Sequence, residues 1–214
     1  MLHNLLVNQL SNTSTPLQYL TSDGEVACFG GAVQELPEFC SDKDIMLQGY
    51  RWMNLTRAFD QKAVALQRTG IIGTYPSSLG QEAISVACGM ALEKEDVFVP
   101  YYRDHGSYLV RGHLIENLLL YWGGDERGSA YKPANGSEYD MPICVPIATQ
   151  ASHAVGIASA FKIQQKKQAV LCTLGDGASS KGDFLEALNL AGSWQLPVVF
   201  VINNNQWAIS VPRY

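Results

Sequence analysis

The sequence predicts an α/β fold in which a mostly parallel sheet carries helices on both faces. Residues 169–174 form a continuous apolar run, which is typical of a strand covered on both sides. Residues 198–202 form a second, β-branched run. Between the runs, apolar residues follow a helical stripe: Phe184, Leu188 and Ala191, with Leu185 beside it. A strand, a helix and a strand in this order favour parallel strands joined by a right-handed crossover.

Polar residues follow both strands, at the edge of the sheet where parallel α/β folds bind ligands. Asp176 comes just after the first strand and Asn205 just after the second. Gly177 and Ala178 are expected to open a helix whose free N–H groups attract phosphate. Mg²⁺ prefers oxygen ligands and takes some of them from substrate phosphates. Asp176, Asn205 and the backbone carbonyl of Trp207 therefore predict a site for a magnesium diphosphate.

Three other interpretations compete for the Gly-Asp-Gly sequence at residues 175–177. By itself it is most often a plain turn. A Rossmann loop would need a third glycine where Ser180 stands, and a P-loop would need a following Gly-Lys-Ser/Thr. The more specific signal is the combination of the turn, a helix, an apolar strand and then Asn-Asn-Gln-Trp-Ala at residues 204–208.

Residues 175–210, GDGASSKGDFLEALNLAGSWQLPVVFVINNNQWAIS, are similar to the thiamine-diphosphate motif. More narrowly, they resemble the alpha subunit of the 2-oxo acid dehydrogenases, and the resemblance extends over the chain from about Thr15 onward. It implies the thiamine-diphosphate-binding fold, with thiamine diphosphate and Mg²⁺ as cofactors. It also implies oxidative decarboxylation of pyruvate or a branched-chain 2-oxo acid, with transfer of the acyl group to the lipoyl domain of an acyltransferase.

The same resemblance assigns residues upstream of this stretch. Tyr102 and Arg103 match the position that holds the cofactor's diphosphate, although a lone arginine is otherwise most often part of a surface ion pair. Val145 would offer its backbone carbonyl to the aminopyrimidine ring, and Ile147 would force the bent shape of the cofactor. His105 keeps two interpretations, titration near the site or capping of the next helix.

The activating glutamate of the resembled family lies in its beta subunit, so an α2β2 assembly is expected. Two features depart from the family pattern. Asn203 stands where branched-chain members have an arginine, so one diphosphate contact is lost or replaced. Family alpha subunits also continue beyond the position of Tyr214, so the chain is expected to be a fragment, or to have its remainder on another polypeptide. A catalytically silent assembly module and a nucleotide-binding Rossmann domain stay open as alternatives.

Composition sets the broad class of protein. With 214 residues, 47% of them apolar, the chain can bury a sizeable core. A net charge of −5 argues against a general nucleic-acid surface. Five cysteines without Cys-x-x-Cys favour a reducing compartment, and no apolar run is long enough to cross a bilayer. These features predict a cytoplasmic protein that binds neither nucleic acid nor membrane.

The remaining segments complete the expected plan. Residues 1–40 are predicted to form an irregular arm with a turn at residues 22–25, and residues 41–214 the thiamine-diphosphate domain, incomplete at its C-terminus. Ser41 is expected to cap a helix that ends at Gly70. Further expected elements are helices over 80–92 and 148–161, a strand over 96–101 and a long polar loop over 123–140. Glu82 and His153 are interpreted as structural residues.

Overall fold

The computed structural model describes residues 18–29, 32–33, 35–129, 139–208 and 211–212, and the chain divides into two compact units, residues 1–47 and 48–214. In the first unit, Leu20 bridges Val26 across a tight turn in which Gly24 has a φ of 83°. A positive φ is the conformation that glycine adopts without strain, so the predicted turn is confirmed. The short elements that follow are β1 (Cys28–Phe29), β2 (Ala32–Val33) and the 3₁₀ helix η1 (Glu38–Ser41).

Helix α2 (Lys43–Arg68) has Asp42 rather than Ser41 as its N-terminal cap. The Oδ1 atom of Asp42 accepts hydrogen bonds from the backbone N–H groups of Asp44 at 2.9 Å and Ile45 at 3.2 Å. The expected cap at Ser41 is therefore wrong by one residue, because Ser41 is taken into the preceding 3₁₀ turn.

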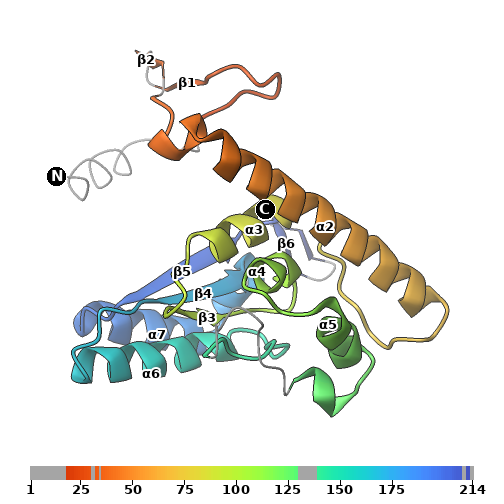
Figure 1. Cartoon of the computed structure of the whole chain (residues 1–214). Helices are drawn as coiled ribbons and strands as arrows, with labels where there is room; N and C mark the ends of the chain where they lie inside the picture. Colours follow the sequence, from red (N-terminus) through yellow and green to blue (C-terminus); the bar gives the residue numbers. More distant parts are fainter. Residues whose placement is uncertain (1–17, 30–31, 34, 130–138, 209–210, 213–214) are drawn as a thin grey trace. The chain divides into compact units, whose positions relative to one another are not determined.

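The second unit is built on a three-stranded parallel sheet in the order β3-β4-β5 (Figure 1). Its central strand is covered on both faces over its first five residues, as the apolar run predicted. Helix α7 joins the central strand to the edge strand β5, so the predicted strand–helix–strand unit with parallel strands is confirmed. The bounds are β3 (Val97–Val99), β4 (Val170–Gly175), α7 (Gly182–Ser193) and β5 (Val198–Asn203).

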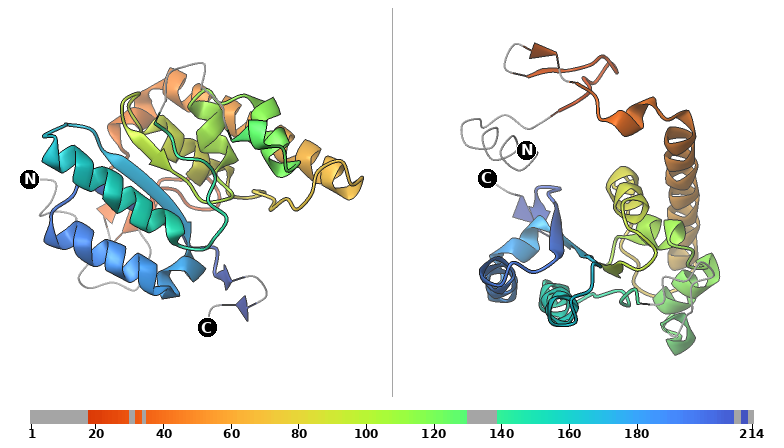
Figure 2. Two further views of the ribbon diagram at one scale, coloured as in Figure 1. Left: turned by 90° about the horizontal axis from the view of Figure 1, so that it is seen from below. Right: turned by 60° about the vertical axis from the view of Figure 1, so that its left-hand side comes forward.

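Alternate residues of the strands face two separate cores, as the pleat of a sheet requires. On one face Val99 and Cys172 pack with residues of α6 and α7, which lie side by side in Figure 2. On the other face Phe98 and Leu171 pack with residues of α2, α3, α4 and α5. The expected helices on both faces are therefore confirmed. The bounds of these helices are α3 (Glu82–Met90), α4 (His105–Val110), α5 (Ile115–Trp122) and α6 (Thr149–Ile163).

The segment between β4 and β5 corrects two predictions. A 3₁₀ helix, η3 (Asp176–Ser180), comes first and α7 starts only at Gly182, so Gly177 and Ala178 do not open the α-helix. The apolar stripe also runs differently, because α7 packs its smaller side chains on the alanine-rich face of α6. The buried residues are Phe184, Ala187 and Ala191, whereas Leu185 and Leu188 are exposed.

Small residues bring α3 and α4 into close contact, as expected from the Ala-, Gly- and Ser-rich sequence of residues 80–92. A Cβ atom on Gly89 would lie 2.9 Å from the Cα atom of Ser107. The backbone N–H of Ser107 donates to Ser85 Oγ at 2.8 Å, and Ser107 Oγ donates to the carbonyl of Ser85 at 2.6 Å. Glu82 pairs with Arg57 at 2.5 Å. The serine bonds fix α4 against α3, and the ion pair joins α3 to α2.

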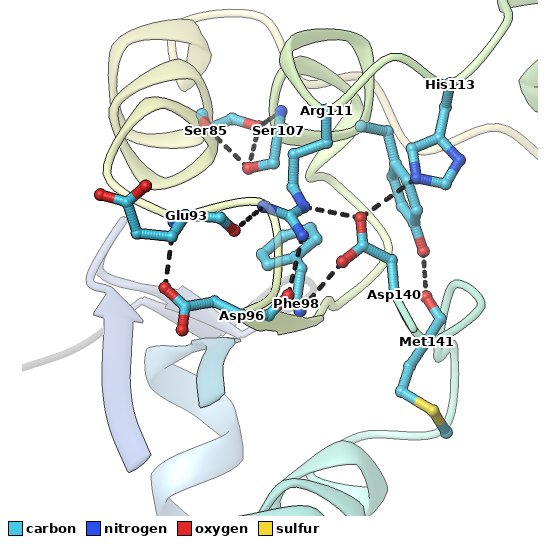
Figure 3. A network of polar contacts seen from close by, with 10 residues as sticks. Ser85, Glu93, Asp96, Phe98, Ser107, Arg111, His113, Asp140 and Met141 are labelled. Atoms are coloured by element: carbon cyan, nitrogen blue, oxygen red, sulfur yellow. Dashed lines mark hydrogen bonds and ion pairs between the residues drawn. The ribbon is translucent and has the colours of Figure 1, made fainter. Parts of the chain in front are cut away.

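Asp140 fixes the chain at the end of the predicted long loop (Figure 3). Its fully buried carboxylate accepts hydrogen bonds from Arg111 Nε at 2.6 Å and from the backbone N–H of Phe98 at 3.1 Å, and lies 3.2 Å from His113 Nε2. Of the loop itself, residues 123–129 contain a 3₁₀ turn, η2 (Glu126–Gly128), and residues 130–138 lie outside the described ranges. Over the described part of the chain, no helix has the length and apolar character needed to cross a membrane.

Candidate functional site

A cleft of about 460 Å³ lies at the carboxyl ends of the three parallel strands. This is the edge at which open parallel sheets bind ligands, and the volume is typical of a small-molecule site. The cleft is lined by residues 101–103, 144–148, Gln150, 175–178, Asn203, Asn205, Trp207 and Ala208.

Each residue that the sequence assigned to cofactor or metal lines this one cleft, except the undecided His105. The assigned residues follow different strands or precede α6, and the fold brings them together: Tyr102, Arg103, Val145, Ile147, Asp176, Gly177, Ala178, Asn205 and Trp207. His153 is exposed on α6 and does not line the cleft.

His105 packs in the core behind the cleft. Its side chain is fully buried, stacks on Tyr75 with ring centroids 5.3 Å apart, and accepts a hydrogen bond from Trp122 Nε1 at 2.9 Å. Burial lowers the pKa of His105 to about 4, so the imidazole is neutral near pH 7. The structure therefore places His105 as a neutral packing residue at the first position of α4.

Among the described residues that line the cleft, Arg103 is the one with a cationic side chain. Its Nε atom donates to the carbonyl of Ser77 at 3.0 Å, and its guanidinium carbon lies 4.8 Å from the ring centroid of Tyr102. Within the described ranges, Arg103 makes no ion pair, and neither of its terminal nitrogens has a hydrogen-bond partner. Both terminal nitrogens thus remain available to an anion in the cleft.

The acidic and amide groups of the cleft provide oxygen ligands. In the part of the chain that is described, the carboxylate of Asp176 has neither a hydrogen bond nor an ion pair. Asn205 Oδ1 accepts a hydrogen bond from the backbone N–H of Trp207 at 3.0 Å, which fixes the loop after β5. Among the described residues no group of three or more His, Cys, Asp or Glu side chains could hold a metal ion. One carboxylate, one amide oxygen and one carbonyl fit Mg²⁺ that takes its other ligands from a bound phosphate.

Gly177 allows the turn after β4 to approach the loop after β5. A Cβ atom at this position would lie 3.2 Å from the Cβ atom of Ala208, which is tighter than ordinary contact. The glycine therefore keeps the two sides of the cleft close together on the β4–β5 side.

The sequence interpretation missed a polar floor under the cleft. Tyr101 Oη donates to Gln81 Oε1 at 2.7 Å, and Asn203 Nδ2 lies 2.7 Å from Gln81 Oε1 and 2.9 Å from Tyr101 Oη. The side chain of Asn203 is thus turned inward, where the resembled branched-chain members have an arginine. Tyr101 could have been found, because it follows β3 at the same edge as Asp176. Asn203, the last residue of β5, was noted only as the place of a lost or replaced diphosphate contact. Gln81 lies in the turn before α3 and had no such signal.

A second missed feature is the wall formed by the start of α6. Gln150 is 2% exposed, donates from Nε2 to the carbonyl of Thr173 at 3.0 Å, and its buried Oε1 atom finds no partner among the described residues. Ala148, the residue before α6, has a φ of 65°, a conformation that alanine rarely adopts. Neither feature has a signature in the sequence.

Asp104, which contacts the backbone of Tyr101, has an unusually high pKa for a carboxyl group. Its buried carboxylate accepts hydrogen bonds from the backbone N–H of Tyr101 at 3.0 Å and from Thr173 Oγ1. Burial raises the pKa of Asp104 to about 7, although both hydrogen bonds act in the opposite direction.

An α/β unit with a cleft of this size at the carboxyl ends of its parallel strands belongs to the class of folds that bind small molecules at that edge. Comparison with known proteins gives the family. Residues 50–214 match the model of the family described as dehydrogenase E1 component, and the chain belongs to this family.

The curated relatives agree with the resemblance drawn from the sequence. The chain is 42% identical over 183 residues to the pyruvate dehydrogenase E1 component subunit alpha of Acholeplasma laidlawii, covering 86% of this chain and 52% of the relative. It is 38% identical over 197 residues to the 3-methyl-2-oxobutanoate dehydrogenase subunit alpha of Mycobacterium tuberculosis, covering 92% and 52%. For the pyruvate dehydrogenase subunit alpha of Bacillus subtilis the identity is 35% over 197 residues, covering 91% and 50%. The chain thus spans about half the length of these relatives.

Proposed function

We propose that this chain is the cofactor-binding part of the alpha subunit of a thiamine-diphosphate-dependent 2-oxo acid dehydrogenase. The substrate is pyruvate or a branched-chain 2-oxo acid, as the names of the relatives suggest. The observation that carries the proposal is that residues chosen from four separate stretches of sequence line a single cleft at the strand ends.

The cleft residues divide the binding of thiamine diphosphate with Mg²⁺ between them. Arg103, with Tyr102 beneath it, would bind the diphosphate through the free edge of its guanidinium group. Asp176, Asn205 and the carbonyl of Trp207 would hold Mg²⁺, which neutralises much of the diphosphate charge. The cofactor, when bound, supplies the electron sink that stabilises the carbanion left by decarboxylation.

The remaining lining of the cleft would orient the cofactor. Val145 would offer its backbone carbonyl to the aminopyrimidine ring, Ile147 would force the bent shape of the cofactor, and Gly177 and Ala178 would lie beside the diphosphate. Val145, Ile147 and Trp207 are 47%, 42% and 56% exposed, so the rim is apolar and open. Exposed apolar residues around a polar cleft favour a site that a second protein surface closes.

That surface, in this proposal, belongs to a beta subunit in an α2β2 assembly. In the resembled family the beta subunit contributes the glutamate that activates the aminopyrimidine, and among the described residues that line the cleft there is no glutamate that would take this role. The lipoyl domain of an acyltransferase accepts the acyl group, and the assembly works in the cytoplasm.

The test is an assay of the chain purified with and without its co-purifying partner, in thiamine diphosphate, Mg²⁺ and an artificial electron acceptor. Pyruvate and 3-methyl-2-oxobutanoate are compared as substrates. Turnover should require the partner and the cofactor, and thiamine diphosphate with Mg²⁺ should raise the melting temperature while NAD should not. Turnover by the chain alone would refute the shared site. Stabilisation by NAD would favour a Rossmann domain, and cofactor binding without turnover in the complex would favour a silent assembly module.

A further inference from the structure

We propose that Asp60, which does not line the cleft, is a positioning residue for Arg103. It lies in α2 and acts through residues 75–78, a stretch of the loop where the chain turns from α2 toward α3. This inference rests on the proposed role of Arg103 as a phosphate ligand, and the experiment below separates failure of that role from failure of the inference.

The carboxylate of Asp60 holds the turn with four hydrogen bonds. Asp60 is 2% exposed, and it accepts from the backbone N–H of Ser78 at 2.7 Å, Ser77 Oγ at 2.7 Å, Tyr75 Oη at 2.9 Å and Ser78 Oγ at 3.2 Å. Burial acts to raise the pKa of Asp60, but these hydrogen bonds outweigh it and hold the pKa below its ordinary value. The carboxylate is therefore ionised at neutral pH and accepts from every donor that the turn directs at it.

The same turn holds Arg103 from its other side. Ser77 donates its hydroxyl to Asp60, while its carbonyl accepts from Arg103 Nε at 3.0 Å. The ring of Tyr102 lies under the guanidinium group. With Nε and one face of the guanidinium fixed, its terminal nitrogens are directed as a rigid pair, which is the geometry that bidentate phosphate binding requires.

Among the described residues, the packing behind the turn is aromatic. Tyr75 packs against Phe59 and Trp122 as well as His105. His105, with its pKa near 4, is neutral at pH 7. The ionised carboxylate of Asp60 thus serves the turn rather than a protonated imidazole.

An asparagine at position 60 has nearly the same shape but carries no charge. With its Oδ1 atom toward the backbone N–H of Ser78, its amide nitrogen would face Ser77 Oγ, and the Ser77 hydroxyl would have to turn and accept a hydrogen bond instead of donating one. Hydrogen bonds to a neutral amide are roughly half as strong as those to a carboxylate, so the carbonyl of Ser77 would be held less firmly in place for Arg103.

The experiment is a double-mutant cycle on the protein purified with its co-purifying partner, with affinity for thiamine diphosphate and Mg²⁺ measured by calorimetry. Asp60→Asn should weaken binding about fivefold to tenfold in the wild-type background. In an Arg103→Met background, which has no guanidinium to position, Asp60→Asn should cause no further loss. The matched control is Thr56→Ala in the same buried part of α2, because the Thr56 hydroxyl donates to the carbonyl of Trp52 and takes no part in the turn. The control should lower the melting temperature without changing affinity.

Equal losses from Asp60→Asn in both backgrounds, or no loss in either, would overturn the inference alone. Wild-type affinity in Arg103→Met would overturn the proposed phosphate role of Arg103 itself. If Asp60→Asn does not fold, the cycle is run with Ser77→Ala, which removes one donor to Asp60 and keeps the carbonyl that binds Arg103. Coupling of Ser77→Ala to Arg103→Met supports the inference, and simple additivity refutes it.

Discussion

Replacing Asp176 by alanine should abolish the stabilisation that thiamine diphosphate and Mg²⁺ confer, while the cofactor-free fold persists. Asp176 is the one residue with a carboxylate among the proposed metal ligands, and its carboxylate has no hydrogen bond or ion pair in the described part of the chain. Its removal therefore breaks no visible support of the fold, and the free energy of unfolding without cofactor should change by less than about 0.5 kcal/mol.

The expected loss of cofactor stabilisation follows from binding linkage. At a cofactor concentration about 100 times the dissociation constant, binding stabilises a protein by about 2.7 kcal/mol. Loss of even an outer partner of a metal ligand weakens metal binding by about 10-fold to 100-fold, so loss of the anionic ligand itself should reach about 100-fold. The same concentration then only equals the dissociation constant of the variant, and the stabilisation falls to about 0.4 kcal/mol.

The assay is thermal unfolding with and without thiamine diphosphate and Mg²⁺, and the matched control is Asp183→Ala. Asp183 is an exposed carboxylate in α7 that pairs with Lys181 at 3.2 Å, so its removal changes the same charge outside the cleft. Asp183→Ala should keep the full cofactor response. A full response in Asp176→Ala would refute the metal assignment.

Three further predictions test the site and its support. Arg103→Lys should weaken cofactor affinity roughly tenfold by calorimetry, because lysine lacks the planar guanidinium group that can bind a phosphate through two nitrogens. The melting temperature without cofactor should change little. An affinity equal to that of the wild type would leave Arg103 a purely structural role. Asp104→Asn should make the free energy of unfolding rise with pH between about pH 4 and 6.5, by up to about 1.4 kcal/mol per unit relative to wild type. In this pH range His105, with a folded pKa of about 4, gains a proton when the protein unfolds, whereas Asp104, with a folded pKa of about 7, loses a proton. The two effects on the free energy of unfolding oppose each other in the wild type, and Asp104→Asn leaves only the effect of His105. An unchanged pH slope in urea titrations would contradict this prediction. Asp140→Ala should cost about 3–5 kcal/mol in urea denaturation, because it removes the carboxylate that balances the charge of the buried Arg111. A loss under about 1 kcal/mol would show that the bonds of Arg111 to the carbonyls of Glu93 and Asp96 suffice.

Residues of the cleft could be predicted from the sequence where a polar or charged side chain comes directly after the end of a strand. Parallel strands end at one edge, so Asp176 and Asn205 could be placed together from the order of the apolar runs, and the family resemblance added Arg103. The same reasoning gave the buried central strand β4, because a strand covered on both faces needs no alternation. Register and helix starts were less accessible, and η3 shows why: a 3₁₀ turn and an α-helix present the same short pattern of residues.

The residues that hold the cleft residues in position could not be predicted from the hydrophobic periodicity of the sequence. Asp60 falls on the buried face of an amphipathic helix, a position that the apolar pattern of α2 would assign to a hydrophobic residue. Its partners at residues 75–78 lie in a loop, and Gln81 lies in a turn. What makes these residues important is the hydrogen bonds they form across the fold, and such pairings depend on tertiary contacts between segments rather than on local spacing.

Residues that bind the ligand and residues that position another side chain have different physical constraints. This difference explains why the first kind could be predicted from the sequence and the second could not. A group that binds ligand must reach the open edge of the sheet, which limits it to the few positions after each strand. A group that positions another need only be buried and matched to its donors, as Asp60 is to Ser77, Ser78 and Tyr75. Many positions satisfy that condition, so the sequence limits the candidates for a positioning residue much less than the candidates for a ligand-binding residue. For the same reason, changes at positioning residues should alter affinity through a partner rather than directly, which is what the coupling between Asp60 and Arg103 measures.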